Sequence, residues 1–432
     1  MLKHTVAEHT LVNGSRGLLI DIPDASVFQI RICFRAGDHY QNDESKWETA
    51  HIMEHLMLGA NNNFASQKEF KSELEKNGAW DNASTQHIDM VYEGGCADFE
   101  WHDFLQLFIG SIDNPIFKQS EFIAECGNVR QELLSRSNEP TIRLSEAMAR
   151  AHGFSVKFEK ERIKLLENVH FKDIGDHFKH THFPANMRFI IAGNLSKKTT
   201  AIIKIMNKKT FGGSKAKTEL PIPYEKAHSI LQPIYIPDRS QSNVTFALNF
   251  YKNRPLSDKE IQSLGLVDHI LSGSLYSRIL GRARNKGLIY GLDSGRFRTH
   301  SLGSLWFGSQ LSQDNLTDFL SILTEEIQAC RSGSISDKEL SSAKQYALGS
   351  YQFEGQTAAD ICDGYLSLYA FDGRIDTYFT KFPEQLANIT NNDVTEALNI
   401  MYEDHIWGIG FLGTVSEKVR KNAYDQLSTL WK

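Results

Sequence analysis

The order of apolar and polar positions predicts strands and helices in succession over the first half of the chain. Residues 26–34 alternate apolar with polar side chains and are rich in β-branched and aromatic residues, which predicts a strand. Residues 47–58 and 67–77 have helical spacing, and Asn77-Gly78 is a typical helix end. The pattern then predicts a strand at 88–93, helical structure over 99–137 with a break near Asn114-Pro115, and a short buried strand at 188–192.

The second half of the chain follows the same order of elements. It predicts strands at 243–250 and 303–310 and helices at 258–271, 314–331 and 337–351. Sequence identity between the halves is weak, so only the order of elements suggests a duplication. Strands and helices mixed in this way favour an α+β fold with helices layered on a sheet.

The chain of 432 residues is too long for one ordinary core, so we expect two or more domains. The best boundary is the stretch 211–223. There, Gly212, Gly213, Pro221 and Pro223 stand among alternating charges, which is typical of an exposed, semi-flexible linker. We expect a first domain at 1–210, a linker at 211–230 and a second domain at 231–432.

Composition excludes several classes of protein. The formal net charge of −6 lacks the basic excess of a nucleic-acid binder, and no apolar run nears the roughly 18 residues that cross a bilayer. His4, Glu8 and His9 stand where a signal peptide would be apolar. The five cysteines form no C-x-x-C motif, which favours buried thiols in a reducing compartment. We expect a protein of the bacterial cytoplasm, or else of the mitochondrial matrix, with no nucleic-acid or membrane partner.

The sharpest chemical signal is the H-x-x-E-H motif formed by His51, Glu54 and His55. Residues four apart on a helix lie on one face, about 5–6 Å from each other, so two imidazoles there can reach one zinc ion. Glu54 shares that face and can act as general base on an activated water. This order of residues is the inverted zincin signature. The alternative is a chance match in a chain with 16 histidines.

A catalytic zinc site needs a third protein ligand. Glu125 and Glu132 are seven residues apart, nearly two helical turns, so both lie on one face of a helix. Such a helix could present Glu132 to the zinc and Glu125 to a histidine N–H. The alternative for both glutamates is a solvent-exposed helix face.

Several motifs in the correct order resemble the pitrilysin-type (M16) metallopeptidases over essentially the whole chain, in particular the subfamily of the mitochondrial processing peptidase and its bacterial relatives. The first is H-x-x-E-H followed after 76 residues by Glu132. The others are Arg35-Ala36-Gly37, Asn82-Ala83-Ser84-Thr85 with Asp89 and Tyr92, Asn114-Pro115-x-Phe117, His182-Phe183-Pro184-Ala185-Asn186-Met187, Ser277-Arg278, and Gly287-Leu288-Ile289-Tyr290. The resemblance implies two similar domains, each a mostly antiparallel sheet with helices packed on it (the M16/LuxS-like metallohydrolase fold).

The resemblance also implies roles for single residues. Zinc would be held by His51, His55 and Glu132. Glu54 would be the general base, and Glu125 would accept a hydrogen bond from one of the ligand histidines. Asn82 and Ala83 would lie at a strand edge that pairs with extended substrate. In the second domain, Tyr290 and an arginine would assist substrate or transition-state binding. The usual arginine position, four residues before Gly287, is Ala283; we favour Arg284, with Arg282 as the alternative.

The function that the resemblance implies is zinc-dependent endopeptidase activity on extended or presequence-like peptides inside a clamshell homodimer. One alternative is a subunit of a heterodimer with a paralogue, because the arginine is displaced. The other is a non-catalytic scaffold of the same fold.

Two further segments bear on the site. His177, His180 and His182 could suggest a second metal site, but no regular element puts all three on one face, so we expect a structural or surface role. Residues 45–49, directly before the motif, replace a glycine-containing stretch of the relatives. We expect this replacement not to touch the metal ligands.

Overall fold

The computed structural model describes residues 1–212 and 218–431 and divides the chain into two compact units. The first unit comprises Met1–Ser135, Glu159–Ile222 and Tyr351–Phe379, and the second comprises Arg136–Phe158, Pro223–Ser350 and Thr380–Lys432. Of the predicted linker 211–230, residues 213–217 lie outside the described residues. The predicted domain limits at 210 and 231 stay a prediction, because each unit draws on both halves of the chain.

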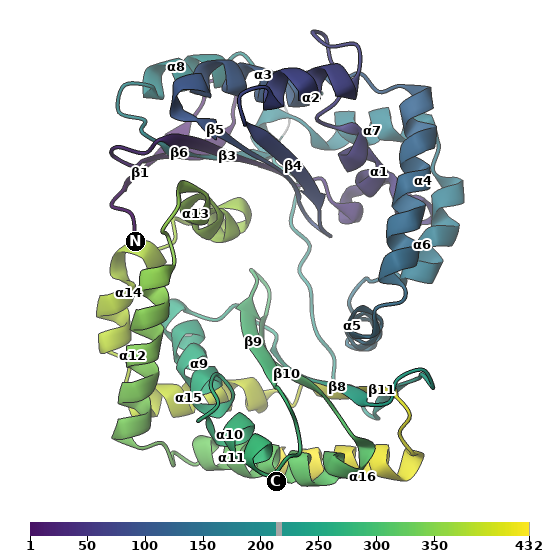
Figure 1. The fold of residues 1–432 in the computed structure, drawn as a ribbon, viewed down its shortest axis with the longest axis vertical. Coiled ribbons are helices and arrows are strands. Elements are labelled where there is room, and N and C mark those ends of the chain that lie inside the picture. The colour runs from purple at the N-terminus through teal and green to yellow at the C-terminus, as the bar shows by residue number, and fades with distance from the viewer. Residues whose placement is uncertain (213–217, 432) are drawn as a thin grey trace. The chain divides into compact units, whose positions relative to one another are not determined.

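The first unit is built on a six-stranded mixed sheet with the order β1-β2-β6-β3-β5-β4 (Figure 1). Strands β2 and β6 are parallel, and all other neighbouring strands are antiparallel. The strands are β1 (Thr5–Thr10), β2 (Arg16–Asp21), β3 (Val27–Phe34), β4 (Trp80–Thr85), β5 (Met90–Ala97) and β6 (Met187–Gly193). Strand β4 ends the sheet, which leaves one of its backbone edges without a strand neighbour in the sheet order.

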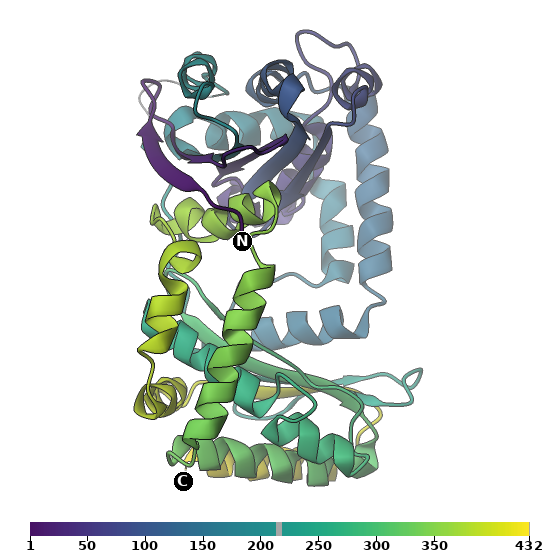
Figure 2. The same ribbon diagram turned by 60° about the vertical axis from the view of Figure 1, so that its left-hand side comes forward.

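Alternating side chains of this sheet enter two different cores. Phe189 and Ile191 of β6 belong to the larger core, beneath helices of the first half of the chain. Ile190 and Ala192 face the opposite side, where α13 (Ala358–Asp372) covers the sheet, as the views from two directions show (Figures 1 and 2). The helices that complete the first unit are α1 (Thr49–Leu56), α2 (Gln67–Glu75), α3 (Trp101–Asp113), α4 (Gln119–Arg136), α6 (Glu159–Leu165), α7 (Phe171–Thr181) and α8 (Thr199–Met206).

The second unit has a five-stranded sheet with the order β7-β11-β8-β10-β9. The strands are β7 (Ile234–Pro237), β8 (Val244–Lys252), β9 (Asp293–Arg298), β10 (Gly303–Leu311) and β11 (Trp407–Gly413). Their order and directions match β2-β6-β3-β5-β4 of the first unit, including one parallel pair, β7 with β11. The duplication suggested by the order of elements is therefore present in the topology, and the predicted α+β fold of two similar parts is confirmed.

Each sheet is covered on one face by a helix from the other half of the chain. In the second unit this helix is α5 (Pro140–Ala151), which packs on β11 and β8. Met148 lies so close to Gly410 that a Cβ at residue 410 would stand 2.5 Å from the Met148 sulfur, so a larger residue there would force Met148 to move. The remaining helices that lie wholly or partly in this unit are α9 (Asp258–Leu271), α10 (Arg278–Asn285), α11 (Leu316–Arg331), α12 (Asp337–Phe353), α14 (Tyr378–Ala387), α15 (Asn391–Glu403) and α16 (Glu417–Leu427).

Over the described residues, no helix combines the length and the apolar character that a membrane crossing requires. All five cysteines are free, and four of them are buried, as their spacing predicts.

Candidate metal centre

Helix α1 presents the H-x-x-E-H motif because its apolar residues point the other way. Ile52, Met53 and Leu56 are buried in the core of the first unit, whereas the motif side chains are only partly buried on the opposite face. The rings of His51 and His55 are one helical turn apart, with centroids separated by 5.0 Å. Helical spacing alone therefore brings the two imidazoles together.

Helix α4 supplies the third side chain. Phe122, Val129 and Leu133 bury one face of this helix, and Glu125 and Glu132 lie on another. Glu132 Oε2 is 3.3 Å from His51 Nε2 and 3.7 Å from His55 Nε2. One ligand atom from each of these three residues lies within 4.8 Å of the other two, and no second group of this kind occurs in the described part of the chain.

Each histidine also contacts a carboxylate through its other ring nitrogen. Glu48 Oε2 accepts a hydrogen bond from His51 Nδ1 at 2.9 Å, and Glu125 Oε2 accepts one from His55 Nδ1 at 3.0 Å. An ionised carboxylate has no proton to donate and can only accept hydrogen bonds, so both Nδ1 atoms carry a proton. Nε2, the atom that faces Glu132, is then the nitrogen that can lose its proton and offer a lone pair to a cation.

Hydrogen bonds within this cluster shift the pKa values of its members. Burial lowers the pKa of His51, but hydrogen bonds with Glu132 and Glu48 outweigh it and raise the pKa to about 9. The hydrogen bond with Glu132 likewise raises the pKa of His55. Hydrogen bonds from both rings hold the pKa of Glu132 far below its ordinary value. Protons and metal ions compete for the same Nε2 atoms, so the affinity of this group for a cation falls with falling pH.

The donor set fits a zinc ion. Two imidazole nitrogens and one carboxylate oxygen are typical ligands of catalytic zinc, which keeps a fourth position open. Orienting carboxylates behind both histidines are also typical of such sites. These are the residues that the sequence singles out as ligands, and the structure brings all three together.

Glu54 lies on the same helix and is partly buried, and burial raises its pKa. Helix α1 packs against β4, which carries Asn82 and Ala83. Asn82 Nδ2 donates a hydrogen bond to Glu93 Oε1 at 2.9 Å. The predicted general base and the predicted peptide-binding edge therefore lie on neighbouring elements of one unit.

Arg284 and Tyr290 belong to the second unit, where the structure brings them to each other. Arg284 Nη1 donates to the Tyr290 carbonyl oxygen at 2.5 Å, and its guanidinium carbon is 4.7 Å from the centre of the Tyr290 ring. The Tyr290 residue is 83% exposed. Arg282 is paired instead with Glu325 and Glu326. Their catalytic roles stay predictions.

The histidines at 177 and 182 have structural roles, as predicted. His177 Nε2 contacts the Ala36 carbonyl oxygen at 2.9 Å, and the His182 ring contacts the Tyr92 and Thr181 hydroxyls at 2.8 and 2.9 Å. Both histidines are buried.

One expectation about the site is wrong. Residues 45–49 were expected to stay clear of the metal ligands, yet Glu48 bonds directly to His51. Glu48 in turn accepts two hydrogen bonds from Arg162 of α6, at 2.6 and 2.9 Å. The position of Glu48, three residues before His51, is a signal that could have been used, because residues three apart on a helix are neighbours. Nothing in the local sequence indicates Arg162, which is 114 residues from Glu48.

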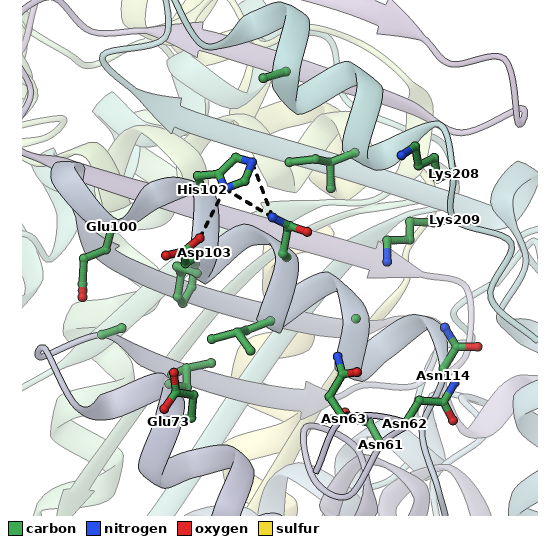
Figure 3. A pocket seen from close by; sticks show the side chains of 18 of the residues that line it. Asn61, Asn62, Asn63, Glu73, Glu100, His102, Asp103, Asn114, Lys208 and Lys209 are labelled. Carbon is green, nitrogen blue, oxygen red and sulfur yellow. Dashed lines mark hydrogen bonds and ion pairs between the residues drawn. The ribbon is translucent and has the colours of Figure 1, made fainter.

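A separate pocket of about 930 Å³ opens on the first unit between α2, α3 and α8 (Figure 3). Lys208 and Lys209 lie at one end, and Glu100 and Asp103 lie at the other. The pocket lining includes none of the motif residues, so the pocket is distinct from the candidate metal centre.

Comparison with known proteins places these features in a family. Residues 17–159 match the model described as insulinase (peptidase family M16), and residues 168–347 match the peptidase M16 inactive domain. The three proposed ligands, together with Glu54 and Glu125, fall in the first range, and Arg284 and Tyr290 fall in the second. No curated protein sequence matches the chain.

Solved structures show the same fold. A protease from Helicobacter pylori is similar with a TM-score of 0.80 and 18% identity, over 95% of this chain and 100% of that one. A peptidase M16 inactive domain from Pseudomonas fluorescens has a TM-score of 0.81 and 18% identity, over 95% and 99%. The periplasmic protease PqqL from Escherichia coli has a TM-score of 0.76 and 14% identity, over 95% and 46%. On the two matching family models, this chain belongs to the M16 family of peptidases.

Proposed function

We propose that this chain is a zinc-dependent endopeptidase that hydrolyses extended or presequence-like peptides. The observation that carries the proposal is the convergence of His51, His55 and Glu132, whose ligand atoms lie within 4.8 Å of one another. Two further features support it: Nδ1 of each histidine is hydrogen-bonded to a carboxylate, and Glu54 lies on the same helix as both histidines.

His51, His55 and Glu132 would hold the zinc ion. When bound, zinc supplies Lewis-acid polarisation of the scissile carbonyl and activation of a water molecule. The Glu54 carboxylate takes the proton from the attacking water and delivers it to the nitrogen of the leaving amine.

The substrate would add to the sheet as a further strand. Strand β4 ends the sheet and packs beside α1, so a peptide paired with its free edge would pass the motif residues. Such pairing recognises the peptide backbone more than its side chains, which suits a substrate defined by an extended conformation. Asn82 and Ala83 are the residues of this edge that we assign to substrate binding.

We also propose a homodimer, because one chain carries both the metal centre and the Arg284–Tyr290 pair. Ala283, buried where the resemblance places arginine, favours the alternative of a heterodimer with a paralogue. Light scattering on the purified chain, combined with a cleavage assay, separates the two. An active dimer of identical chains supports the homodimer, and an inactive chain that gains activity from a second polypeptide supports the heterodimer.

The sharpest test of the activity is Glu54→Gln. This variant keeps the size and shape of the side chain and removes its basicity, so we expect bound zinc to remain and peptide cleavage to fall by about 10²–10⁴-fold. Glu75→Gln, an exposed change on α2, is the control and retains full activity. Full activity in Glu54→Gln would remove Glu54 from the mechanism.

The match of residues 168–347 to an inactive domain favours a second candidate, a non-catalytic protein of the same fold. The two candidates differ in the metal. A scaffold would bind no stoichiometric zinc and show no chelator-sensitive cleavage, whereas the peptidase binds one zinc ion per chain and loses activity with chelator.

A further inference from the structure

Behind His51 lies a buried charged group that goes beyond the ligands and the general base. Glu48 is fully buried, and its two carboxylate oxygens accept hydrogen bonds from Arg162 Nε and Nη2 at 2.6 and 2.9 Å. The same Glu48 Oε2 that meets Arg162 Nη2 also accepts the bond from His51 Nδ1 at 2.9 Å. Arg162 is itself 3.4 Å from Glu159, a second buried carboxylate.

We propose that Glu48, clamped by Arg162, is a positioning residue that fixes the ring of His51 so that its Nε2 faces Glu132. This inference rests on the proposed zinc site and deepens it. The geometry supports it because an ionised carboxylate offers no proton, so Nδ1 is the donor to Glu48 and Nε2 is the nitrogen left to bind a cation once it loses its proton. A bidentate arginine then limits the rotation of the carboxylate, and with it the tilt of the imidazole.

The energetics favour a role in positioning over a role in stability. Taking a carboxylate and a guanidinium out of water is unfavourable, and their attraction offsets this only with near-ideal geometry. Apolar residues of similar volume would serve the core as well or better. A fully buried carboxylate that touches a candidate metal ligand is therefore best explained by what it does to that ligand.

The two histidines are held differently. Glu125, which orients His55, is 17% exposed and accepts its other hydrogen bond from the neutral amide of Asn128. Glu48, which orients His51, is 0% exposed and is held by a charged, two-pronged donor. His51 is consequently the more rigid of the two histidines, and we expect the zinc affinity to depend strongly on Glu48.

Glu48→Gln tests the proposal, with Glu159→Gln as the matched control. Both variants neutralise a buried carboxylate that contacts Arg162, but only Glu48 bonds to His51. Zinc affinity is measured by competition with a chelator, and the visible spectrum of the cobalt-substituted chain reports the ligand geometry. We expect Glu48→Gln to weaken zinc binding by about 10–100-fold and to change the cobalt spectrum, and Glu159→Gln to leave both within threefold of wild type.

Arg162→Lys provides a second variant that keeps the charge and removes the two-pronged bond. It is expected to weaken zinc binding less than Glu48→Gln does, and it keeps the proposal testable should Glu48→Gln fail to fold. Equal zinc affinity in wild type, Glu48→Gln and Arg162→Lys would overturn the positioning role, as would an equal loss in Glu159→Gln. If wild type itself binds no zinc, the proposed function fails instead, so the two failures are distinguishable.

Discussion

The two units share one topology, but the side chains that connect two corresponding pairs of helices differ. In the first unit, α1 and α4 meet through two histidines and two glutamates. In the second unit, α9 and α12 hold the same places in the order of elements, and they meet through His269 stacked on Tyr346, with ring centroids 3.9 Å apart. In the described part of the chain, only the first pair forms a group that could hold a metal.

This difference shows that the fold supplies the meeting of two helices and that the side chains decide its chemistry. Glu339 and Tyr346 of α12 have the same seven-residue spacing as Glu125 and Glu132 of α4. In the second unit the ring of Tyr346, and not a carboxylate, packs on the imidazole of His269. Burial lowers the pKa of His269, which favours the neutral ring that such stacking suits.

The largest expected effect, on zinc binding, comes from removing a side chain from the contact between α1 and α4 in the first unit. Glu132→Ala removes a proposed ligand, and because losing a supporting residue costs 10–100-fold, losing a ligand is expected to weaken zinc binding by more than about 100-fold. Cleavage should fall in parallel, while the fold persists because the Glu132 side chain is 41% exposed. Metal analysis and a peptide assay check this, with Glu121→Ala on the same helix as control. Unchanged zinc content in Glu132→Ala would contradict the account.

Acid is expected to destabilise both units through one buried histidine in each. Burial lowers the pKa of His177 in the first unit and of His152 in the second to about 4, against about 6.5 in an unfolded chain. The contribution of each neutral ring to the free energy of unfolding is therefore fully present above pH 6.5, and it is lost as the pH falls from 6.5 towards 4. The loss is about 3 kcal/mol for each histidine.

Denaturant unfolding at several pH values measures this effect. We expect His177→Gln to flatten the fall of the unfolding free energy between pH 6.5 and 4, and the same change at the exposed His102 to leave it as in wild type. An identical slope in wild type and His177→Gln would show that this buried histidine does not titrate as described.

The smallest effect should come from breaking the pair in the second unit. Tyr346→Ala removes the ring that stacks on His269, and because Tyr346 is 54% exposed, we expect a loss of about 1 kcal/mol of unfolding free energy. Tyr346→Phe keeps the stacked ring and should stay within about 0.5 kcal/mol of wild type. Zinc affinity should not change in either variant. A weaker zinc site in Tyr346→Ala would mean that the two helix pairs are coupled and not independent.

Periodicity was sufficient to predict many elements. The alternation at 26–34 corresponds to β3, the helical spacing at 258–271 matches α9, and the break at Asn114-Pro115 separates α3 from α4. The metal residues could be found because two of them share one helix turn and because Glu125 and Glu132 share one helix face. Local sequence patterns therefore predict those parts of the site that lie within a single helix or strand.

What the sequence could not show depends on contacts between distant segments. An amphipathic helix reveals which face is apolar but not which sheet will cover it, so the exchange of α5 and α13 between the halves was not predicted. In the first unit, α13 is tied to the sheet by Asp363, which accepts a bond from Arg31 at 2.6 Å across 332 residues. The clamp of Glu48 by Arg162 was missed for the same reason.

The most direct test of the central claim is the position of the metal itself. Crystals of the chain grown with zinc, and measured on both sides of the zinc absorption edge, would locate the ion by its anomalous scattering. We predict one strong peak per chain, about 2.0–2.2 Å from His51 Nε2, His55 Nε2 and a Glu132 oxygen. A peak elsewhere, or none at these three side chains in a chain that cleaves peptides, would contradict it.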